Sequence, residues 1–381
     1  MARSWLFSLW SRSLMKLDPV PINDLSRWNP IDRAEVIECM KQVASSGFFM
    51  RGPHTSDLEN QLGMMLNGMN VVCVGNGTDA LALALLSLGI KPGEEVATVA
   101  NAGGYATGAI LRIGAIPILV DVDLITAQMS VASLSAQLEI HPKIRAVVVT
   151  HLFGLMSDMQ SIRDLTITKG ILLIEDCAQA IGASQYGIPA GAWGDASTFS
   201  FYPTKNLACL GDGGAVAVKN PDQADTCRRL AQHGWSERYV ISDSNGFNSR
   251  IDEIQAAILV SRVQRLAHNN QVRKSIISRY VKILNETRYM VCSTADNFVG
   301  HLAVMVSPRR QTDIEKLNHA KIGNGIHYPV LDHLQPAWKK QFAGVSLPNS
   351  ERLVKLIVTL PCFPLMTENE ISRVCEVLES L

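Results

Sequence analysis

The sequence predicts an α/β protein whose mostly parallel central sheet is covered by helices on both faces. Two observations carry this prediction: short apolar runs alternate with helical patterns, and polar or glycine-rich turns follow the runs. Strands buried on both faces read as continuous apolar segments. In such sheets ligands bind beyond the carboxyl ends of the strands. The predicted strands are Val71–Val74, Val96–Val99, Ile116–Val120, Ala146–Thr150, Ile171–Ile174 and Ser197–Phe201.

Composition bounds the class of protein. A chain of 381 residues with 47% hydrophobic and 18% charged residues is typical of a well-buried, two-domain enzyme. Its formal net charge is zero, so electrostatics give no case for a nucleic-acid partner. The eight cysteines form no C-x-x-C pair and no Cys/His cluster along the chain. This argues against a metal site and fits buried thiols in a reducing, cytoplasmic compartment.

Residues 1–20 are interpreted as an N-terminal extension. The segment mixes Trp5, Phe7 and Trp10 with Arg3 and Arg12. It lacks the long apolar core and the small-residue cleavage site of a signal peptide. Two interpretations stay open: an amphipathic helix at a membrane surface, or an extension that is disordered or packs on a partner subunit. The sequence contains no apolar stretch long enough to span a bilayer.

The first elements of the chain lead to an anion site. A helical pattern over Asp32–Ser46 precedes a loop in which Phe48, Phe49 and Arg51 either line a pocket or serve as ordinary packing and a surface charge. After the strand Val71–Val74 comes the turn Gly-Asn-Gly-Thr-Asp, residues 75–79, and then a helix over Ala80–Leu88. Free backbone N–H groups and the helix dipole both favour a phosphate there. The alternative is a plain N-cap by Thr78.

The stretch from Ile171 to Gly214 organises the chemistry. Asp176 follows a predicted buried strand, and Lys205 lies just beyond the strand Ser197–Phe201. An acid and a lysine in these places suit pyridoxal phosphate (PLP), which needs a lysine for its Schiff base and a carboxylate at its ring nitrogen. A buried carboxylate beside that nitrogen favours its protonated form. Lys205 would then also act as the proton shuttle. The alternatives are a helix cap for Asp176 and a solvated charge for Lys205.

Here the sequence resembles a known family. EDCAQAIGA (175–183) and GDASTFSFYPTKNL (194–207) are similar to the sugar aminotransferase (DegT/StrS) family, a branch of the fold type I PLP-dependent transferases. The likeness runs from about Pro21 to the C-terminus. It implies a large PLP-binding domain over 21–260 and a small C-terminal α+β domain over 261–381. Within the latter, Leu302–Val306 is predicted as a strand and Thr312–Ala320 as a helix.

The resemblance assigns cofactor roles to individual residues. GNGTDAL resembles the family's phosphate-binding motif, so Gly77, Thr78 and Asp79 would contact the PLP phosphate. Tyr105 would stack on the cofactor ring, although many members carry the aromatic residue at the place of Gly104. Further cofactor contacts are implied for Gln179, one helical turn from Asp176, and for Ser200.

The same resemblance implies residues for the substrate and for a partner subunit. In the G-x-N-x-R segment, Asn248 would reach the PLP phosphate of a second subunit in a two-fold homodimer with shared sites, with Arg250 near the substrate. A helix over Asp252–Leu266 follows. The bland alternative is an Asn/Gly loop before a capped helix. His327 and Tyr328 in GIHYP would face the sugar.

Two residues beyond this segment leave the substrate contacts open. His333 is a weaker candidate for a contact to the sugar. Asp332 stands where many members have a small or apolar residue, so the local contacts to the substrate are in doubt.

The leading hypothesis is a PLP-dependent aminotransferase that moves an amino group to a nucleotide-linked keto-deoxysugar, with pyridoxamine phosphate as the intermediate cofactor form. The resemblance implies L-glutamate as the amino donor. This reaction would serve the biosynthesis of amino sugars for a surface polysaccharide or a glycosylated metabolite. A related sugar dehydratase is disfavoured, because such relatives replace the lysine that stands here as Lys205. A non-catalytic regulator with the same fold stays open. A dinucleotide-binding oxidoreductase is disfavoured because GNGTDA lacks the G-x-G-x-x-G spacing.

Overall fold

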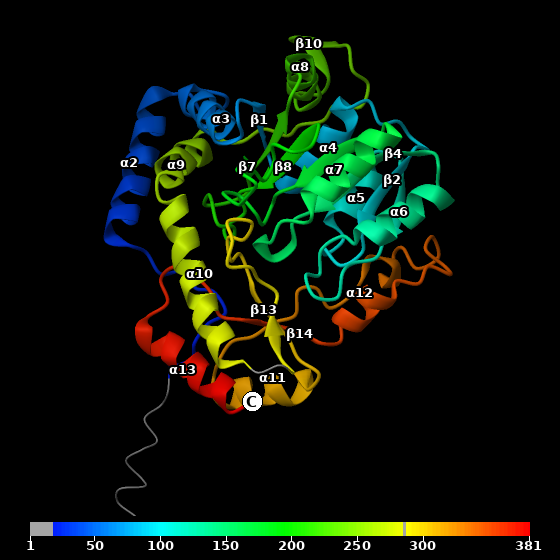
Figure 1. Cartoon of the computed structure of the whole chain (residues 1–381). Helices are drawn as coiled ribbons and strands as arrows, with labels where there is room; N and C mark the ends of the chain where they lie inside the picture. Colours follow the sequence, from blue (N-terminus) through cyan, green and yellow to red (C-terminus); the bar gives the residue numbers. More distant parts are fainter. Residues whose placement is uncertain (1–17, 285–286) are drawn as a thin grey trace, which may run out of the picture.

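The computed structural model describes residues 18–284 and 287–381 (Figure 1). The amphipathic pattern in the first residues of the chain lies outside the described part. Among the described residues, no helix is both long and apolar enough to cross a membrane.

The centre of the molecule is a seven-stranded sheet, as the apolar runs predict. Its strands, in chain order, are β1 (Asn70–Val74), β2 (Glu95–Val99), β3 (Ile116–Val120), β4 (Ile144–Thr150), β5 (Leu172–Asp176), β8 (Ala196–Ser200) and β9 (Gly214–Val218). They lie in the order β1-β9-β8-β5-β4-β2-β3, and only β9 runs against its two neighbours. The prediction of a mostly parallel sheet is confirmed.

Helices cover both faces of this sheet because alternate side chains of each strand point to opposite sides. Val147 and Val149 join one apolar cluster, while Val148 between them joins the other. The helices of the N-terminal two thirds are α2 (Pro30–Ser46), α3 (Pro53–Met65), α4 (Gly77–Ser87), α5 (Tyr105–Arg112), α6 (Val131–Ile140), α7 (Met159–Lys169), α8 (Pro221–Leu230) and α9 (Glu253–Val263). A short 3-10 turn, η1 (Leu152–Gly154), follows β4.

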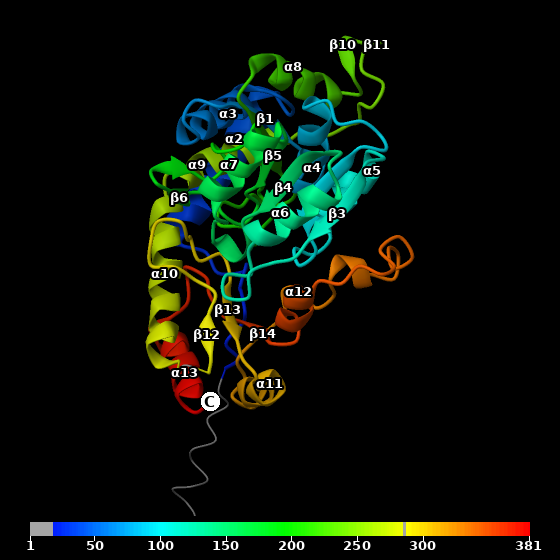
Figure 2. The same ribbon diagram turned by 45° about the vertical axis from the view of Figure 1, so that its right-hand side comes forward.

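The C-terminal third forms a smaller α+β unit. The long helix α10 (Leu266–Ile283) runs from the large sheet towards it in both views (Figures 1 and 2). The unit contains an antiparallel sheet of β12 (Tyr289–Met290), β13 (Ala303–Val306) and β14 (Ile357–Leu360). Its other elements are α11 (Arg310–His319), η2 (Asp332–Leu334), α12 (Pro348–Leu353) and α13 (Glu368–Glu379).

The large unit also contains two small β-hairpins. One pairs β6 (Ser184–Gln185) with β7 (Ile188–Pro189), and the other pairs β10 (Trp235–Glu237) with β11 (Val240–Ile241). The second projects above α8 (Figure 1). The predicted division at residues 20 and 260 stays a prediction. At the first of these positions, Val20 forms a bridge with Ile322 of the C-terminal unit.

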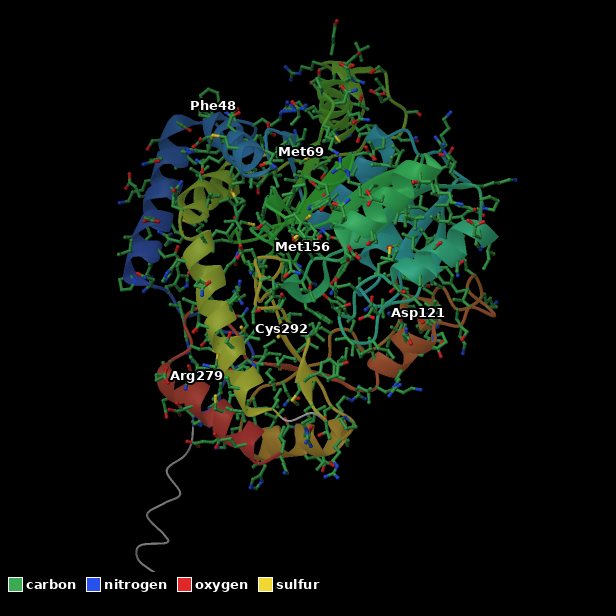
Figure 3. All side chains as sticks on the ribbon, viewed as in Figure 1. Phe48, Met69, Asp121, Met156, Arg279 and Cys292 are labelled. Carbon is green, nitrogen blue, oxygen red and sulfur yellow. The ribbon has the colours of Figure 1, made fainter. Side chains whose placement is uncertain are left out.

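Specific contacts hold the two units together. The Asp121 carboxylate, just after β3, accepts hydrogen bonds from the backbone N–H groups of Asn349 and Ser350 at 2.9 Å each. It thereby caps the first turn of α12 from the other unit, and Figure 3 shows Asp121 next to that helix. Arg27 reaches the Glu370 carboxylate of α13 through two hydrogen bonds of 2.6 and 2.7 Å.

Candidate active site

A cavity of about 490 Å³ opens at the carboxyl ends of the parallel strands. Thr150, Asp176 and Ser200 stand at the ends of β4, β5 and β8 and all line it. This is the position at which α/β sheets bind ligands. Most of the residues predicted for the site lie on its wall: Gly77, Thr78, Tyr105, Asp176, Gln179, Ser200, Lys205, His327 and Tyr328.

Asp176 is the last residue of β5, whereas the sequence predicted it as the second residue after the strand. The strand therefore extends two residues beyond the predicted Ile171–Ile174 and starts one residue later. The carboxylate is 5% exposed and accepts hydrogen bonds from the Ala178 N–H at 3.1 Å and the Thr150 hydroxyl at 3.2 Å. Burial raises the pKa of Asp176, while these donors and the nearby Lys205 oppose the rise. Such a carboxylate favours a cationic group beside it.

Lys205 lies in the turn after β8, where its backbone N–H donates a hydrogen bond to the Tyr202 carbonyl at 2.8 Å. Burial lowers the pKa of Lys205, and the charge of Asp176 acts in the opposite direction. A desolvated lysine is present as a free amine more often than a solvated one, and the free amine is the nucleophile. The pair thus combines a nucleophilic amine with a buried acid.

Asn76, Gly77 and Thr78, at the N-terminus of α4, line the same cavity, and we call this turn the cradle. Asn76 is the N-cap of α4 and accepts the Asp79 N–H at 2.8 Å, so the interpretation of Thr78 as the cap is wrong. Gly77 and Thr78 then face the cavity at the positive end of the helix. A Cβ at Gly77 would stand 2.8 Å from the Ser200 Cβ, so only glycine lets this turn approach β8 so closely.

Asp79 is not brought to the cavity. Its carboxylate forms an ion pair of 2.5 Å with Arg112 of α5 and accepts a hydrogen bond from the Asn76 side chain at 3.1 Å. The Asp79 side chain therefore ties α4 to α5 behind the cradle.

Tyr105 begins α5 and lies on the cavity wall. Gly103 and Gly104 before it have φ angles of 78° and 80°, a region that favours glycine. A Cβ at Gly103 would lie 3.0 Å from the Tyr105 ring and 3.1 Å from the Tyr328 ring. The missing side chain at Gly103 thus leaves room for the Tyr105 ring, which meets the Tyr328 ring edge-on with the ring centroids 6.1 Å apart.

The other predicted wall residues are fixed by hydrogen bonds. The Gln179 amide donates to the Tyr328 hydroxyl at 3.1 Å, and its carbonyl accepts the Phe153 N–H at 2.6 Å. His327 Nδ1 lies 2.8 Å from the Thr359 hydroxyl. Burial raises the pKa of Tyr328, so this hydroxyl stays protonated. The wall therefore presents oriented, neutral hydrogen-bonding groups.

Asn248 and Arg250 lie away from the cavity. They bond each other at 2.8 Å, in the loop between the β10–β11 hairpin and α9. The helix predicted over Asp252–Leu266 ends at Val263 and is followed directly by α10. Placement of these two residues outside their own chain's cavity is compatible with either reading of this loop, and their role stays a prediction.

Three further sequence interpretations require correction. Phe48 and Phe49 are 58% and 59% exposed and line no cavity, so they are neither packed in the described chain nor part of its pocket. Figure 3 shows Phe48 at the outer edge of the molecule, beside α3. Asp332 and His333 are both buried outside the cavity. Asp332 bonds the Thr107 hydroxyl, and His333 lies 3.3 Å from Glu351.

The fold also gathers a His/Cys/Glu group that the linear spacing does not reveal. His151, Glu175 and Cys177 lie together at the end of β5, and all three are buried. Glu175 accepts the backbone N–H groups of Gly191, Trp193 and Gly194 at 2.8 to 3.0 Å, and His151 Nε2 lies 3.0 Å from it. Burial raises the pKa of the Cys177 thiol well above its usual value. Protein partners thus satisfy the carboxylate, and the group acts as a structural buttress of β5.

Sequence reasoning missed several residues of the wall: Ile22, Asn23, Asn76, Thr150, Arg273 and His301. Thr150 could have been found, because it ends a predicted strand next to Asp176. Asn23, Arg273 and His301 carried no local signal, since they reach the site from the N-terminal segment, the middle of α10 and the loop before β13.

Comparison with known proteins agrees with this geometry. The sequence matches the DegT/DnrJ/EryC1/StrS aminotransferase family over residues 30–379. The chain belongs to this family. The predicted resemblance is confirmed, and the family makes the protein a PLP-dependent aminotransferase of fold type I.

Individual relatives cover nearly the full length. The chain is 35% identical to the dTDP-3-amino-3,4,6-trideoxy-alpha-D-glucose transaminase of Micromonospora megalomicea subsp. nigra, over 92% of this chain and 95% of the relative. It is 33% identical to a pleiotropic regulatory protein of Geobacillus stearothermophilus, over 94% and 97%. Among solved structures, S. venezuelae DesV in complex with a ketimine intermediate superposes with a TM-score of 0.90 at 32% identity, over 95% and 98%.

Proposed function

We propose that this aminotransferase transfers an amino group from L-glutamate to a ketone of a nucleotide-linked deoxysugar in the biosynthesis of amino sugars. The observation that carries the proposal is the half-buried Lys205 near the buried Asp176, beside the α4 cradle and at the strand ends that line one cavity of about 490 Å³. Named relatives that act as transaminases of dTDP-linked and UDP-linked sugars support the substrate class.

The residues of the cavity fit PLP. Gly77, Thr78 and Ser200 would hold its phosphate at the N-terminus of α4, and Asp176 would hold the proton on its ring nitrogen. The cofactor, when bound, supplies an electron sink for the carbon that gains or loses the amine. Lys205 would move the proton at that carbon, because an amine whose pKa is lowered by desolvation gives and takes a proton more readily near neutral pH.

The alternatives are weighed by the same residues. A sugar dehydratase of this family would need no lysine at position 205, whereas this lysine is present on the cavity wall, half-buried and within the field of Asp176. One relative carries the name pleiotropic regulatory protein, which is the ground for considering a regulator. A retained nucleophile, acid and phosphate cradle in one cavity favour catalysis over a purely regulatory role.

The assembly, the compartment and the biological use complete the proposal. A homodimer with shared sites is supported by Asn248, which lies off its own cavity, and by apolar side chains left exposed at Phe48, Phe49 and Ile241. The cysteines of the described chain are free thiols, which suits the cytoplasm. The product would serve a surface polysaccharide or a glycosylated metabolite.

The test is a panel of nucleotide-linked 3-keto and 4-keto sugars incubated with the protein and L-glutamate. Mass spectrometry should detect an amino sugar and 2-oxoglutarate in equal amounts, and the Lys205→Ala variant should give neither. Production of a deoxygenated sugar without net amine transfer would favour the dehydratase. Binding of the sugars without turnover by wild-type protein that has taken up PLP would favour the regulator.

A further inference from the structure

Arg273 is a buried cation without an acidic partner. Its side chain, in the middle of α10, is 6% exposed, and Nη1 donates to the Cys362 carbonyl at 2.7 Å. Nε is buried and has no partner, and no carboxylate within the described residues pairs with the guanidinium. Arg288 shows the contrast: at 5% exposure it bonds both carboxylate oxygens of Asp313 at 2.9 and 3.0 Å.

An unpaired buried charge is costly, so this guanidinium requires an explanation. Burial lowers the pKa of Arg273, but a guanidinium stays protonated in proteins. Five donors in a planar fork match a carboxylate or a phosphate. One carbonyl oxygen satisfies only part of this capacity, which leaves the fork available for an anion from outside the chain.

Arg273 reaches ligand space. It lines the main cavity and also an adjoining hollow of about 290 Å³, and Lys205 lines both. The Gly300 backbone packs closely against the stem of the arginine, since a Cβ added at Gly300 would stand only 3.1 Å from the Arg273 Cβ. The guanidinium therefore belongs to the wall that also carries the reactive amine.

The neighbouring His301 is neutral and adds no negative charge. Its Nδ1 lies 2.8 Å from Asn206 Oδ1. The Asn206 amide donates to Asn270 Oδ1 and to the Val299 carbonyl, which fixes its oxygen towards the histidine. Nδ1 therefore carries the hydrogen. Burial, and then the charges of Lys205 and Arg273, hold the pKa of His301 well below its usual value.

The chemistry of the two substrates selects the anion. In an α-amino acid the carboxylate is attached to the carbon that bears the amine, so it must lie within a few bonds of the atoms that Lys205 serves. The diphosphate of a nucleotide sugar is separated from a ring ketone by the sugar itself. The cofactor phosphate belongs to the cradle at α4.

We propose that Arg273 binds the carboxylate of the amino-acid donor, an inference that rests on the proposed function. In the donor half-reaction the amine passes to the cofactor and the amino acid leaves as its 2-oxo acid, while the carboxylate is unchanged. Arg273 would hold that carboxylate through substrate and product. It would take no part in the half-reaction with the sugar ketone, which carries no such group.

The test separates the two half-reactions of the holoenzyme. Arg273→Gln and Arg273→Lys are compared with wild type in single turnovers: loss of the cofactor's visible band with L-glutamate, and its recovery from the pyridoxamine form with the active keto-sugar. Arg27→Lys is the matched control, since Arg27 lines the same hollow but pairs with Glu370. Binding of 2-oxoglutarate to the pyridoxamine form, by calorimetry, gives a readout independent of turnover.

We expect Arg273→Gln to lose at least ~30-fold in the glutamate rate constant and in 2-oxoglutarate affinity, as for one partner of a buried charge pair. The keto-sugar step should change less than about threefold, and Arg27→Lys should resemble wild type in both. Arg273→Lys should be intermediate, because it keeps the charge but loses the fork.

Several results would overturn the assignment. Equal losses in both half-reactions would make Arg273 structural, and a loss confined to the keto-sugar step would give it to the nucleotide sugar. If Arg273→Gln does not fold, the ratio of the two steps in Arg273→Lys decides in the same way. Failure of wild type to react with any of a panel of α-amino acids would instead refute the proposed function.

Discussion

Asp332 offers a quantitative test of the contact between the two units. It is 1% exposed, its Oδ2 lies 2.5 Å from the Thr107 hydroxyl, and its Oδ1 is buried without a partner. Burial raises the pKa of Asp332 from 3.8 to about 7, although the hydrogen bond from the Thr107 hydroxyl opposes the rise. The folded protein therefore binds this proton more tightly than the unfolded chain does.

The sign of the pH dependence follows from that difference. Between pH 4 and 7 the native state holds more protons than the unfolded state, so this group's contribution to stability falls as pH rises. It is fully present below pH 4 and lost once pH passes about 7. A rise of about three units corresponds to about 4 kcal/mol as an upper bound. For a chain of this length, 1 kcal/mol shifts Tm by about 1–2 °C.

The perturbation is Asp332→Asn, which keeps the shape and cannot ionise. The difference in Tm, variant minus wild type, should increase by a few degrees between pH 5.5 and 8, measured by thermal unfolding in matched buffers. Asp313→Asn is the control: Asp313 is equally buried but paired with Arg288. It should be destabilised at both pH values, since it leaves that arginine unpaired. A difference for Asp332→Asn that is constant over this range would refute the reasoning.

The remaining predictions concern the cofactor and the assembly. Borohydride should fix PLP to wild type but not to folded Lys205→Ala, as peptide mapping would show; an adduct at another lysine would reject the assignment. Asp176→Asn should keep PLP bound yet slow both half-reactions by at least ~10²-fold, as for other single electrostatic contacts, and near wild-type turnover would leave Asp176 as a structural residue. Gly77→Ala should weaken PLP binding, measured by equilibrium dialysis, because its Cβ would meet Ser200 at 2.8 Å; unchanged affinity would argue against the cradle. Mixing Lys205→Ala with Asn248→Asp chains should restore activity, because one mixed-dimer site keeps both residues; an inactive Asn248→Asp with no rescue would reject the shared site.

Local chemistry made much of the fold and the site predictable from sequence. The apolar runs marked the buried strands, and Asp176 and Lys205 were found because polar residues at strand ends meet at one edge of a parallel sheet. Ser200 came from the resemblance to the family. The phosphate cradle was recognisable from a glycine turn between a strand and a helix. The exact role of Asn76 was not, because an N-cap is decided by backbone geometry that differs by a residue or two.

Residues that depend on packing between distant segments escaped prediction. Arg273 carried no local signal, and only the fold shows that Gly300 and Cys362 lie against it. Asp332 read as a departure near the substrate, whereas it is buried against α5. Asp79 read as a phosphate ligand from its place in the motif, but Arg112, 33 residues away, takes its carboxylate.

The arrangement of these residues divides the work of the site between the two units. The large unit supplies Lys205, Asp176 and the cradle, which are the groups that we propose hold the cofactor. The C-terminal unit and α10 supply His301, Tyr328 and Arg273, which line the same cavity. We propose that this part of the wall faces the amino donor and the keto-sugar. Contacts such as that of Asp332 with Thr107 set how closely the second group approaches the first. A change at the Asp332–Thr107 contact, which lies beside Tyr105, should therefore alter the discrimination between donor and keto-sugar more than the retention of PLP.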